Sequence, residues 1–382
     1  MKRKIYYVGC YDDYMNNRNL NTQPSGITKM HYIKEALKNA GFYVSIFSIA
    51  ECKSNKIKFN NRQKILIDDS EDIDYIYSIG RKNLILKLIS RIILLIQLLK
   101  FIIWERSKND IILVYHSLAI SKIIYFIQII CKRKIYFEVE EIYQAVYHGS
   151  NKKVKKEINY LTRSNGYIFV NDVIREKCNL KGKYAVCYGN YLMQQNNSSK
   201  KNNDGKIHIV YAGVIEHEGT DAYLAINVAK YLSSKYHIHI LGYGLENNIR
   251  KMVNYLENIQ TKCIVTYDGC LTGDEYLHFL SKCHIGLCTR VLENDLSDYA
   301  FPSKLLVYLS NNLRTVCTPI KVIQKSKISS HLFFSANNNP DSIANVILSF
   351  DLNYKFDNST LIKELHSDFI LQLQSLFCTN HE

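Results

Sequence analysis

One segment of the chain has residue types that suit ligand binding more than those of any other segment. It is a short strand followed, after a loop, by Phe301-Pro302-Ser303-Lys304. The apolar segment His284–Cys288 predicts the strand, and the four residues stand after a polar loop, directly before an amphipathic helix. Proline is tolerated in the first turn of a helix, whose free N–H groups and dipole suit an anion, above all a phosphate. We therefore predict an anion site here. The alternative is an ordinary strand–loop–helix unit with a proline start.

Glycines follow three other predicted strands. Pro24-Ser25-Gly26 comes after the first strand and before a helix, Gly213 follows a strand in the C-terminal half, and Gly242 and Gly244 follow the next one. Glycine lets a backbone approach a ligand closely. Any strand-to-helix turn can also use a glycine, so each position fits an ordinary turn as well.

Titratable side chains stand at two strand ends of the N-terminal half. His116 ends the apolar strand IILVYH, and Glu138-Val139-Glu140-Glu141 follows the next strand. Ligands of open α/β sheets bind at the carboxyl ends of strands. His116 is therefore either a ligand contact or a hydrogen-bonded structural histidine. The carboxylates either form part of a binding site or begin a solvated helix.

The segment around Pro302 resembles the nucleotide-sugar-binding segment of glycosyltransferase family 4, whose members have the GT-B fold. Residues 211–219, 241–244 and 284–310 carry the resemblance. It implies an α/β protein of two Rossmann-like parallel-sheet domains facing a central cleft. It also implies transfer, with retention, of a sugar from a nucleoside-diphosphate sugar to a polysaccharide or lipid-linked glycan, with no cofactor and no metal.

The same resemblance implies roles for particular residues. His116 would contact the transferred sugar, and Glu138 and Glu141 would belong to the catalytic site on the acceptor side. The residues expected to bind the donor are Gly26, Gly213, Gly242, Gly244, Arg290, Pro302, Ser303 and Lys304.

Two features of the family pattern are absent. The positions of its usual Arg/Lys pair and of its two glutamates hold Val214, Glu218, Tyr299 and Val307. Arg290, Lys304 and the Ser303 N–H could replace the missing cations, because a departing diphosphate needs positive charge beside it. The losses also leave two alternatives open: a catalytically silent GT-B subunit that binds a partner transferase, or another GT-B nucleotide-sugar enzyme such as an epimerase.

Strand and helix patterns alternate along the chain and restart after a polar tract at 195–206. Such alternation favours parallel sheets. We predict an N-terminal acceptor domain over 1–195, a nucleotide-sugar-binding domain over 205–352, and a C-terminal segment, 353–382, whose helix crosses back to the first domain. The acidic string Asp68–Asp72 is predicted to be a solvated turn, and Tyr75–Ile79 a strand.

Composition limits the partners. The 382 residues carry a formal net charge of +14, which implies anionic partners. No zinc finger or aromatic RNA-binding motif accompanies the charge, so nucleic acid is not expected. The chain has eleven cysteines, with no CxxC pair and no Cys/His zinc spacing, and they are interpreted as reduced thiols of a cytoplasmic protein.

The segment Leu84–Trp104 is apolar but contains Lys87, Arg91 and Lys100. Its cations, together with Ser90 and Gln97, fall within about half of a helical wheel by the 3.6-residue period. It is either a core helix of the first domain, a helix that lies on an anionic membrane, or a membrane span, for which three charges are costly. We expect peripheral association with the inner face of the cell membrane.

Overall fold

The computed structural model describes residues 2–13, 18–54, 56, 58–80, 83–192, 204–291, 298–351 and 356–378. The chain forms two compact units, one made of Met1–Asn190 with His366–Glu382 and the other of Tyr191–Leu365. Of the tract 195–206 expected to be a linker, residues 195–203 lie outside the described residues, as do residues 292–297 in the loop before Phe301.

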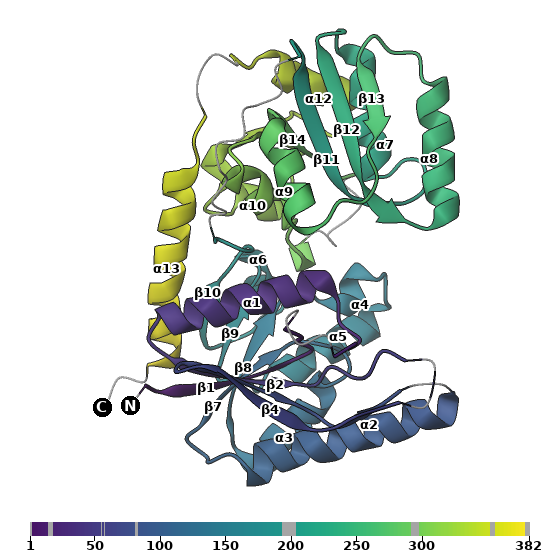
Figure 1. Cartoon of the computed structure of the whole chain (residues 1–382). Helices are drawn as coiled ribbons and strands as arrows, with labels where there is room; N and C mark the ends of the chain where they lie inside the picture. Colours follow the sequence, from purple (N-terminus) through teal and green to yellow (C-terminus); the bar gives the residue numbers. More distant parts are fainter. Residues whose placement is uncertain are drawn as a thin grey trace. The chain divides into compact units, whose positions relative to one another are not determined.

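The first unit is built on an eight-stranded sheet in the order β10-β9-β8-β7-β1-β2-β5-β4 (Figure 1). Only the β4–β5 pair of this sheet is antiparallel. The strands are β1 (Lys4–Gly9), β2 (Tyr43–Ser48), β4 (Gln63–Asp68), β5 (Glu71–Tyr75), β7 (Ile111–Tyr115), β8 (Lys134–Val139), β9 (Gly166–Phe169) and β10 (Lys183–Val186). The central strands are nearly continuous apolar runs, as expected for parallel strands covered on both faces.

Helices cover both faces of this sheet. Helix α1 (Pro24–Asn39) lies across one face, and α2 (Leu84–Leu99), continued by the π-helix η2 (Lys100–Trp104), lies across the other (Figure 1). The remaining helices are α3 (Ser121–Cys131), α4 (Tyr143–Val146), α5 (Asn151–Leu161) and α6 (Val173–Lys177), and β3 (Phe59–Asn60) pairs antiparallel with β6 (Ser78–Ile79).

The prediction of a solvated turn for the acidic string holds for Asp69 and Ser70 and is wrong for Glu71 and Asp72. Strand β5 begins at Glu71 and all five of its residues are buried, whereas Tyr75 ends this strand instead of starting one. Glu71 is 1% exposed and accepts a hydrogen bond from the Lys34 ammonium over 2.9 Å, and Lys4 reaches Asp72 over 2.9 Å. Buried carboxylates persist when they are paired. Periodicity alone could not reveal partners that lie on other elements.

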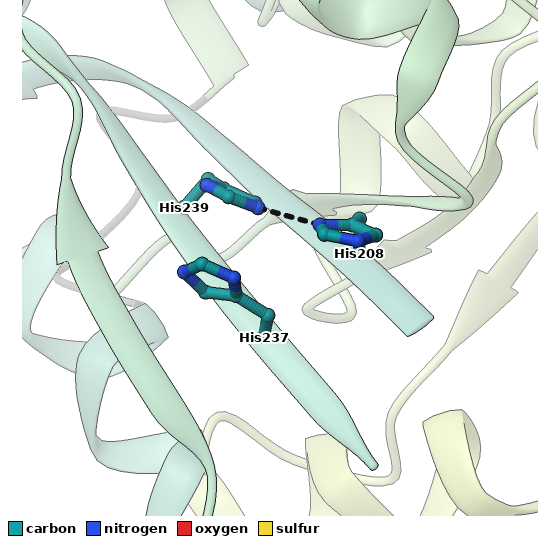
Figure 2. A group of neighbouring side chains, drawn as sticks. All are labelled: His208, His237 and His239. Carbon is teal, nitrogen blue, oxygen red and sulfur yellow. Dashed lines mark hydrogen bonds between the residues drawn. The ribbon is translucent and has the colours of Figure 1, made fainter. Parts of the chain in front are cut away.

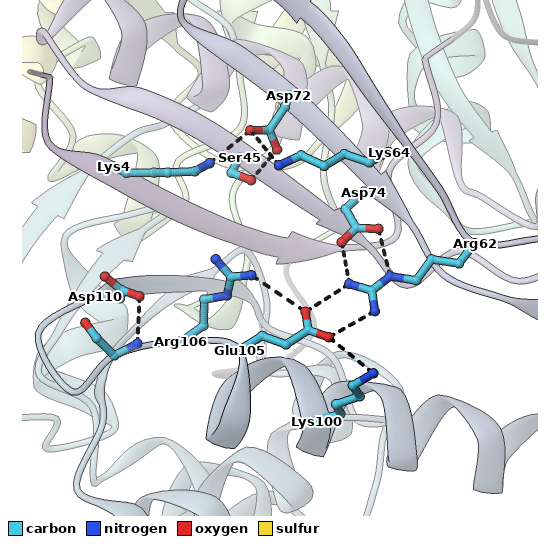
Figure 3. A network of polar contacts seen from close by, with 11 residues as sticks. Lys4, Ser45, Arg62, Lys64, Asp72, Asp74, Lys100, Glu105, Arg106 and Asp110 are labelled. Carbon is cyan, nitrogen blue, oxygen red and sulfur yellow. Dashed lines mark hydrogen bonds and ion pairs between the residues drawn. The ribbon is translucent and has the colours of Figure 1, made fainter.

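The ion pairs extend along the outer strands of this sheet. Arg62 lies between Asp74 and Glu105 (Figure 3). Its Nη2 nitrogen is 2.7 Å from an oxygen of Asp74 and 2.9 Å from an oxygen of Glu105. Asp74 is on β5, and Glu105 follows η2. The network therefore attaches the end of the α2–η2 segment to the edge of the sheet.

The second unit has a six-stranded, all-parallel sheet in the order β13-β12-β11-β14-β15-β16. Its strands are β11 (Ile207–Ile215), β12 (Tyr236–Gly244), β13 (Ile264–Tyr267), β14 (Ile285–Cys288), β15 (Arg314–Cys317) and β16 (Leu332–Phe334). Its helices are α7 (Asp221–Val228), η3 (Ala229–Tyr231), α8 (Glu246–Asn258), α9 (Gly273–Lys282), α10 (Lys304–Ser310), α11 (Lys321–Gln324), η5 (Ser329–His331) and α12 (Pro340–Leu348). Side chains of α7, α8 and α12 pack on one face of the sheet, and those of α9 and α10 on the other.

The last helix, α13 (Ser359–Phe377), contributes its residues from His366 onward to the first unit. Phe369 is fully buried there and its ring stacks on Tyr32, with 5.9 Å between ring centroids. The Arg3 guanidinium donates to the Phe377 carbonyl over 2.7 Å. Within the described parts of the chain, no helix is long and apolar enough to cross a bilayer.

Candidate active site

The glycine loop of the first unit lies at the start of α1. The helix begins at Pro24, three residues earlier than predicted, so Gly26 lies in its first turn. Among the described residues, a Cβ added to Gly26 would have one neighbour within 4 Å, the Tyr115 hydroxyl at 3.7 Å. Packing against the described residues therefore does not require glycine at position 26. The glycine leaves open space beside the first turn of the sixteen-residue helix α1.

A buried lysine, which sequence reasoning did not single out, lies one turn further along α1. Lys29 is 7% exposed; its ammonium donates to the Cys187 carbonyl over 2.7 Å and lies 3.2 Å from the Glu140 carboxylate. Burial alone would lower the pKa of Lys29, but Cys187, Glu140 and Glu138 together outweigh it and raise this pKa. Lys29 therefore stays charged in the interior.

Two glutamates face this lysine at the end of β8. Glu138 is fully buried and accepts a hydrogen bond from the Tyr7 hydroxyl. Burial and the nearby Glu140 raise the pKa of Glu138, and burial also raises that of Glu140. Two carboxyl groups this close cannot both ionise readily, so the pair shares protons at neutral pH. Such a pair beside an ammonium can accept or release a proton.

Glu141, the other glutamate predicted to be catalytic, is not part of this pair. It is half-buried, and its charge acts on Tyr143, whose pKa is raised first by burial and next by Glu141. The structure thus groups Glu138 with Glu140. Alternation along an extended strand could have indicated this, because residues two apart point to the same side.

His116 is completely buried, and both of its ring nitrogens have protein partners. Nδ1 lies 2.7 Å from the Ser121 hydroxyl and Nε2 lies 2.8 Å from Glu157. Glu157 also accepts the backbone N–H groups of Tyr143 and Gln144, over 2.8 and 2.7 Å. This geometry fits the structural alternative left open above: His116 orients Glu157, which holds the loop after β8.

In the second unit, Lys304 lies beside β11. Its ammonium is 4.1 Å from the centre of the Tyr211 ring, and a Cβ on Gly213 would come within 2.9 Å of it. Gly213 therefore leaves the room that this ammonium occupies. Burial lowers the pKa of Lys304, against opposing effects of Cys288 and Asp221. Among the described residues, no carboxylate lies within ion-pairing distance of the ammonium.

Arg290 adds a second cation. It is half-buried, and its charge also lowers the pKa of Lys304. Its backbone is fixed from two sides, because its N–H donates to the Thr318 hydroxyl and that hydroxyl donates to its carbonyl, each over 2.9 Å. Asp221 holds the next residue by accepting the N–H of Val291 over 2.9 Å.

The sequence pattern predicts a helix over 303–311, and the observed helix starts one residue later. Helix α10 runs from Lys304 to Ser310, with Ser303 as N-cap, and is only seven residues long. Ser303 is exposed and Pro302 half-buried. Because the dipole of so short a helix is small, the ammonium of Lys304 is the larger source of positive charge here.

Gly242 and Gly244 have a packing reason to be glycine. Strands β11 and β12 continue past the predicted ends, and Gly213 pairs with Gly242 and Ile215 with Gly244. A Cβ on Gly242 would lie 1.8 Å from the Gly213 carbonyl oxygen, and one on Gly244 would lie 2.2 Å from that of Ile215. These glycines let two backbones meet beside Lys304, and their contact with a donor stays a prediction.

A surface pocket of about 540 Å³ lies beyond β11 and contains none of the predicted donor residues. It is lined by Glu216, His217, Glu218, Tyr223, Asn248, Lys251, Asn254, Tyr255 and Asn258. The loop after β11 thus faces α7 and α8 with acidic side chains at the place where the family pattern would have cations.

Comparison with known proteins shows the fold. No protein-family model matches the chain, and no curated protein sequence does. Solved structures do: "Trehalose-6-phosphate from E. coli bound with UDP-2-fluoro glucose" matches with a TM-score of 0.70 at 8% identity, covering 98% of this chain and 99% of that one. The α,α-trehalose 6-phosphate synthase of Burkholderia multivorans matches with a TM-score of 0.65 at 8% identity, covering 99% and 95%.

A third neighbour is a UDP-forming α,α-trehalose-phosphate synthase from Burkholderia xenovorans in complex with glucose-6-phosphate. Its TM-score is 0.59 at 11% identity, and the match covers 98% of this chain and 96% of that one. The chain has two large, mainly parallel sheets, and the solved structures that it resembles cover almost its whole length. Together these findings confirm the predicted GT-B fold. Membership of glycosyltransferase family 4 stays a prediction, because no sequence model matches.

Proposed function

We propose that the protein is a glycosyltransferase that takes a sugar from a nucleoside-diphosphate sugar. Support comes from the GT-B fold, which it shares along almost its whole length with sugar-transferring synthases, one of them bound with UDP-2-fluoro glucose. At 8% identity the likeness shows the fold alone, and the residues of the site are what favour activity.

The observation that carries the proposal is the ammonium of Lys304. It belongs to a half-buried side chain, lies beside the Tyr211 ring, is close to a second cation and has no carboxylate partner among the described residues. An unpaired cation in such surroundings is costly unless an anion joins it. A nucleoside diphosphate supplies that anion.

The chemistry follows from this placement. When the bond between the sugar and the diphosphate breaks, negative charge grows on the leaving phosphate oxygen. Lys304 and Arg290 would offset that charge through charge-assisted hydrogen bonds, which strengthen as the charge develops. In the first unit, the pair of Glu138 and Glu140 beside Lys29 is the candidate for handling the acceptor's proton.

We further propose that the acceptor is a polysaccharide or lipid-linked glycan and that the enzyme works on the inner, anionic face of the cell membrane. The support is the outer surface of α2. Its large exposed aliphatic side chains are Leu84, Ile85, Leu88, Ile89, Ile92 and Ile96. Lys87, Arg91 and Lys100 are exposed on the same segment. A contiguous apolar surface with cations suits an anionic bilayer.

The orientation of α2 differs from the predicted one in one respect. Ser90 is buried and donates to Glu51, and Gln97 donates to the Tyr77 carbonyl over 2.9 Å, so both point inward. The polar residues that the helical wheel placed on one side of α2 therefore lie in two different surroundings. The uncharged Ser90 and Gln97 form hydrogen bonds with other parts of the protein, and the three cations are exposed together with the aliphatic side chains.

The direct test is an assay of donor hydrolysis and of transfer to lipid-linked glycan acceptors, over a panel of UDP-, GDP-, dTDP- and CMP-sugars. We expect one nucleotide class to be turned over without added metal, and the anomeric configuration to be retained in the product. A chain that binds none of these donors would contradict the proposal and favour the silent-subunit alternative. Epimerised donor sugar without transfer would favour the epimerase.

A further inference from the structure

Three histidines meet at the amino-terminal end of the second unit's sheet. His208 is the second residue of β11, and His237 and His239 are the second and fourth residues of β12 (Figure 2). His208 pairs with His237 in the strand register, so all three side chains share one sheet face. One nitrogen from each ring lies within 4.8 Å of the other two.

Hydrogen bonds to carboxylates fix the orientation of two of these rings. Asp204 lies 3.0 Å from Nε2 of His208, and Asp268 lies 3.1 Å from Nδ1 of His239. An ionised carboxylate only accepts hydrogen bonds, so each of these nitrogens carries the proton. Carboxylates that hold the outer N–H of an imidazole in this way are typical neighbours of metal-binding histidines.

The inner nitrogens of the same two rings then face each other with their lone pairs. His208 Nδ1 and His239 Nε2 are 2.8 Å apart (Figure 2). Two lone pairs at this distance repel unless a proton or a metal ion lies between them. Zinc–nitrogen bonds of about 2.0–2.1 Å at tetrahedral angles need nitrogens ~3.3 Å apart. A shift of a few tenths of an ångström at each ring is enough to admit the ion.

The third ring is placed to complete the set. Nε2 of His237 lies 3.0 Å from the Thr266 hydroxyl, which itself donates to Asp268 over 2.8 Å. The hydroxyl therefore accepts from Nε2, and Nδ1 of His237 is the nitrogen that can bind an ion. The rings of His237 and His239 are 3.9 Å apart at their centres.

We propose that His208, His237 and His239 bind one Zn²⁺ ion in a structural site that ties β11 to β12 and, through Asp268, to the end of β13. Three imidazoles suit zinc, a water can occupy the fourth position, and Asp204 and Asp268 balance the charge of the ion. The absence of zinc-site spacing among the cysteines did not exclude this site, because it uses histidine alone. The signal in the sequence was His-x-His on a strand.

The site is separate from the proposed donor site. His208 and Gly213 are five residues apart on β11, which corresponds to roughly 16 Å along an extended strand. The ion would therefore stabilise the second unit without touching the donor. Zinc binding and glycosyl transfer can thus fail independently in experiment.

The test uses the full chain, stripped with a chelator and titrated with ZnCl₂ by calorimetry, with thermal unfolding as a second readout. We expect one Zn²⁺ per chain and a midpoint that rises with zinc concentration. His237→Gln should weaken binding at least tenfold and abolish the thermal shift. The matched control is His278→Gln, an exposed histidine on α9, which should bind as the wild type does.

Two further measurements decide the ligands. Asp268→Asn keeps all three histidines and should weaken zinc binding by about tenfold to a hundredfold, as loss of a supporting carboxylate does. If His237→Gln does not fold, the Asp268→Asn variant serves as the test in its place. Co²⁺ in place of Zn²⁺ should give the visible bands of a four-coordinate ion without a thiolate charge-transfer band. A wild-type chain without stoichiometric binding, equal affinity in the Asp268→Asn and wild-type chains, or a thiolate band would overturn the proposal.

Discussion

At the scale of single residues, two lysines, the buried Lys29 and the half-buried Lys304, have opposite surroundings. Lys29 has the carboxylate of Glu140 at 3.2 Å, whereas no carboxylate among the described residues pairs with Lys304. The charge of Lys29 is therefore balanced by a side chain of the protein itself. The charge of Lys304 is not balanced by a described carboxylate, so a bound anion would stabilise it, and we assign the donor diphosphate to Lys304 for this reason.

Lys304→Ala should weaken binding of the correct nucleotide sugar by tenfold to a hundredfold. The reason is that a charge-assisted hydrogen bond to phosphate contributes about 1.5–3 kcal/mol. Calorimetry with the donor identified in the panel assay checks this, with Lys230→Ala, an exposed lysine of the same unit, as control. If both variants bound the donor as tightly as the wild type, the donor site would lie elsewhere.

Glu138 should make the stability of the chain depend on pH. Burial and Glu140 raise its pKa to about 8, so the folded state holds a proton that the unfolded chain releases above its ordinary pKa. Stability should therefore fall as pH rises between about 4.5 and about 8, by at most about 1.4 kcal/mol per pH unit for one proton. Glu138→Gln should flatten this slope.

Urea unfolding of the wild type and of Glu138→Gln at pH 5, 6.5 and 8 measures that slope. Histidines titrate in the same range, but they are common to both proteins, so the difference reports the glutamate pair. Parallel pH profiles would contradict the assignment of a shared proton to Glu138 and Glu140.

At the scale of elements, close backbone contacts and surface charge decide what a strand or a helix can do. The β11–β12 pair stays joined to its end because Gly242 and Gly244 have no side chains, whereas a Cβ on Gly26 at the start of α1 would meet no described residue closer than 3.7 Å. The two glycines look alike in the sequence and differ in their surroundings.

Gly242→Ala should destabilise the second unit by about 1–3 kcal/mol and weaken donor binding, because the new methyl group would displace the strand beside Lys304. Gly26→Ala should leave stability within about 0.5 kcal/mol of the wild type. Thermal unfolding and donor titration of both variants measure this. Equal stabilities would show that the β11–β12 contact relaxes without cost.

Helix α2 should bind anionic vesicles through its cations and its aliphatic surface. Changing Lys87, Arg91 and Lys100 together to Gln should weaken binding to phosphatidylserine or cardiolipin vesicles and reduce its salt dependence, since each surface cation contributes about 1 kcal/mol. Changing the exposed Lys152, Lys153 and Lys156 of α5 to Gln removes the same charge elsewhere. Equal effects of the two triple variants in sedimentation assays would count against a specific role for α2.

At the scale of the whole molecule, each of the two units is built on one large sheet, and the last helix contributes to the core of the first unit. His366–Glu382 belongs to the unit formed by Met1–Asn190, far away in sequence. The first unit therefore cannot be completed before the residues from His366 onward have been synthesised.

Phe369→Ala should destabilise the first unit by about 3–5 kcal/mol, because it removes a fully buried ring that stacks on Tyr32. Leu371→Ala, on the same helix but 64% exposed, should change stability by no more than about 0.5 kcal/mol. Chemical unfolding followed by circular dichroism distinguishes the two. A small effect of Phe369→Ala would mean that α13 is dispensable for the first unit.

The sequence by itself determined the fold class. Apolar runs such as IILVYH and the helical periods of α8 and α9 are local patterns, and their alternation allows little besides parallel sheets covered by helices. The segment around Phe301 likewise carried enough local pattern to indicate an anion site. Local periodicity survives in the fold because each element forms from residues that are neighbours in the chain.

Only the tertiary structure decided which charged and polar side chains meet. It buried Glu71 and Asp72 beside lysines, paired Glu138 with Glu140 instead of Glu141, and turned His116 inward toward Glu157. It also brought His208 to His239 from 31 residues away. Charge pairing and desolvation depend on distances between elements, and a linear pattern of residue types does not contain those distances.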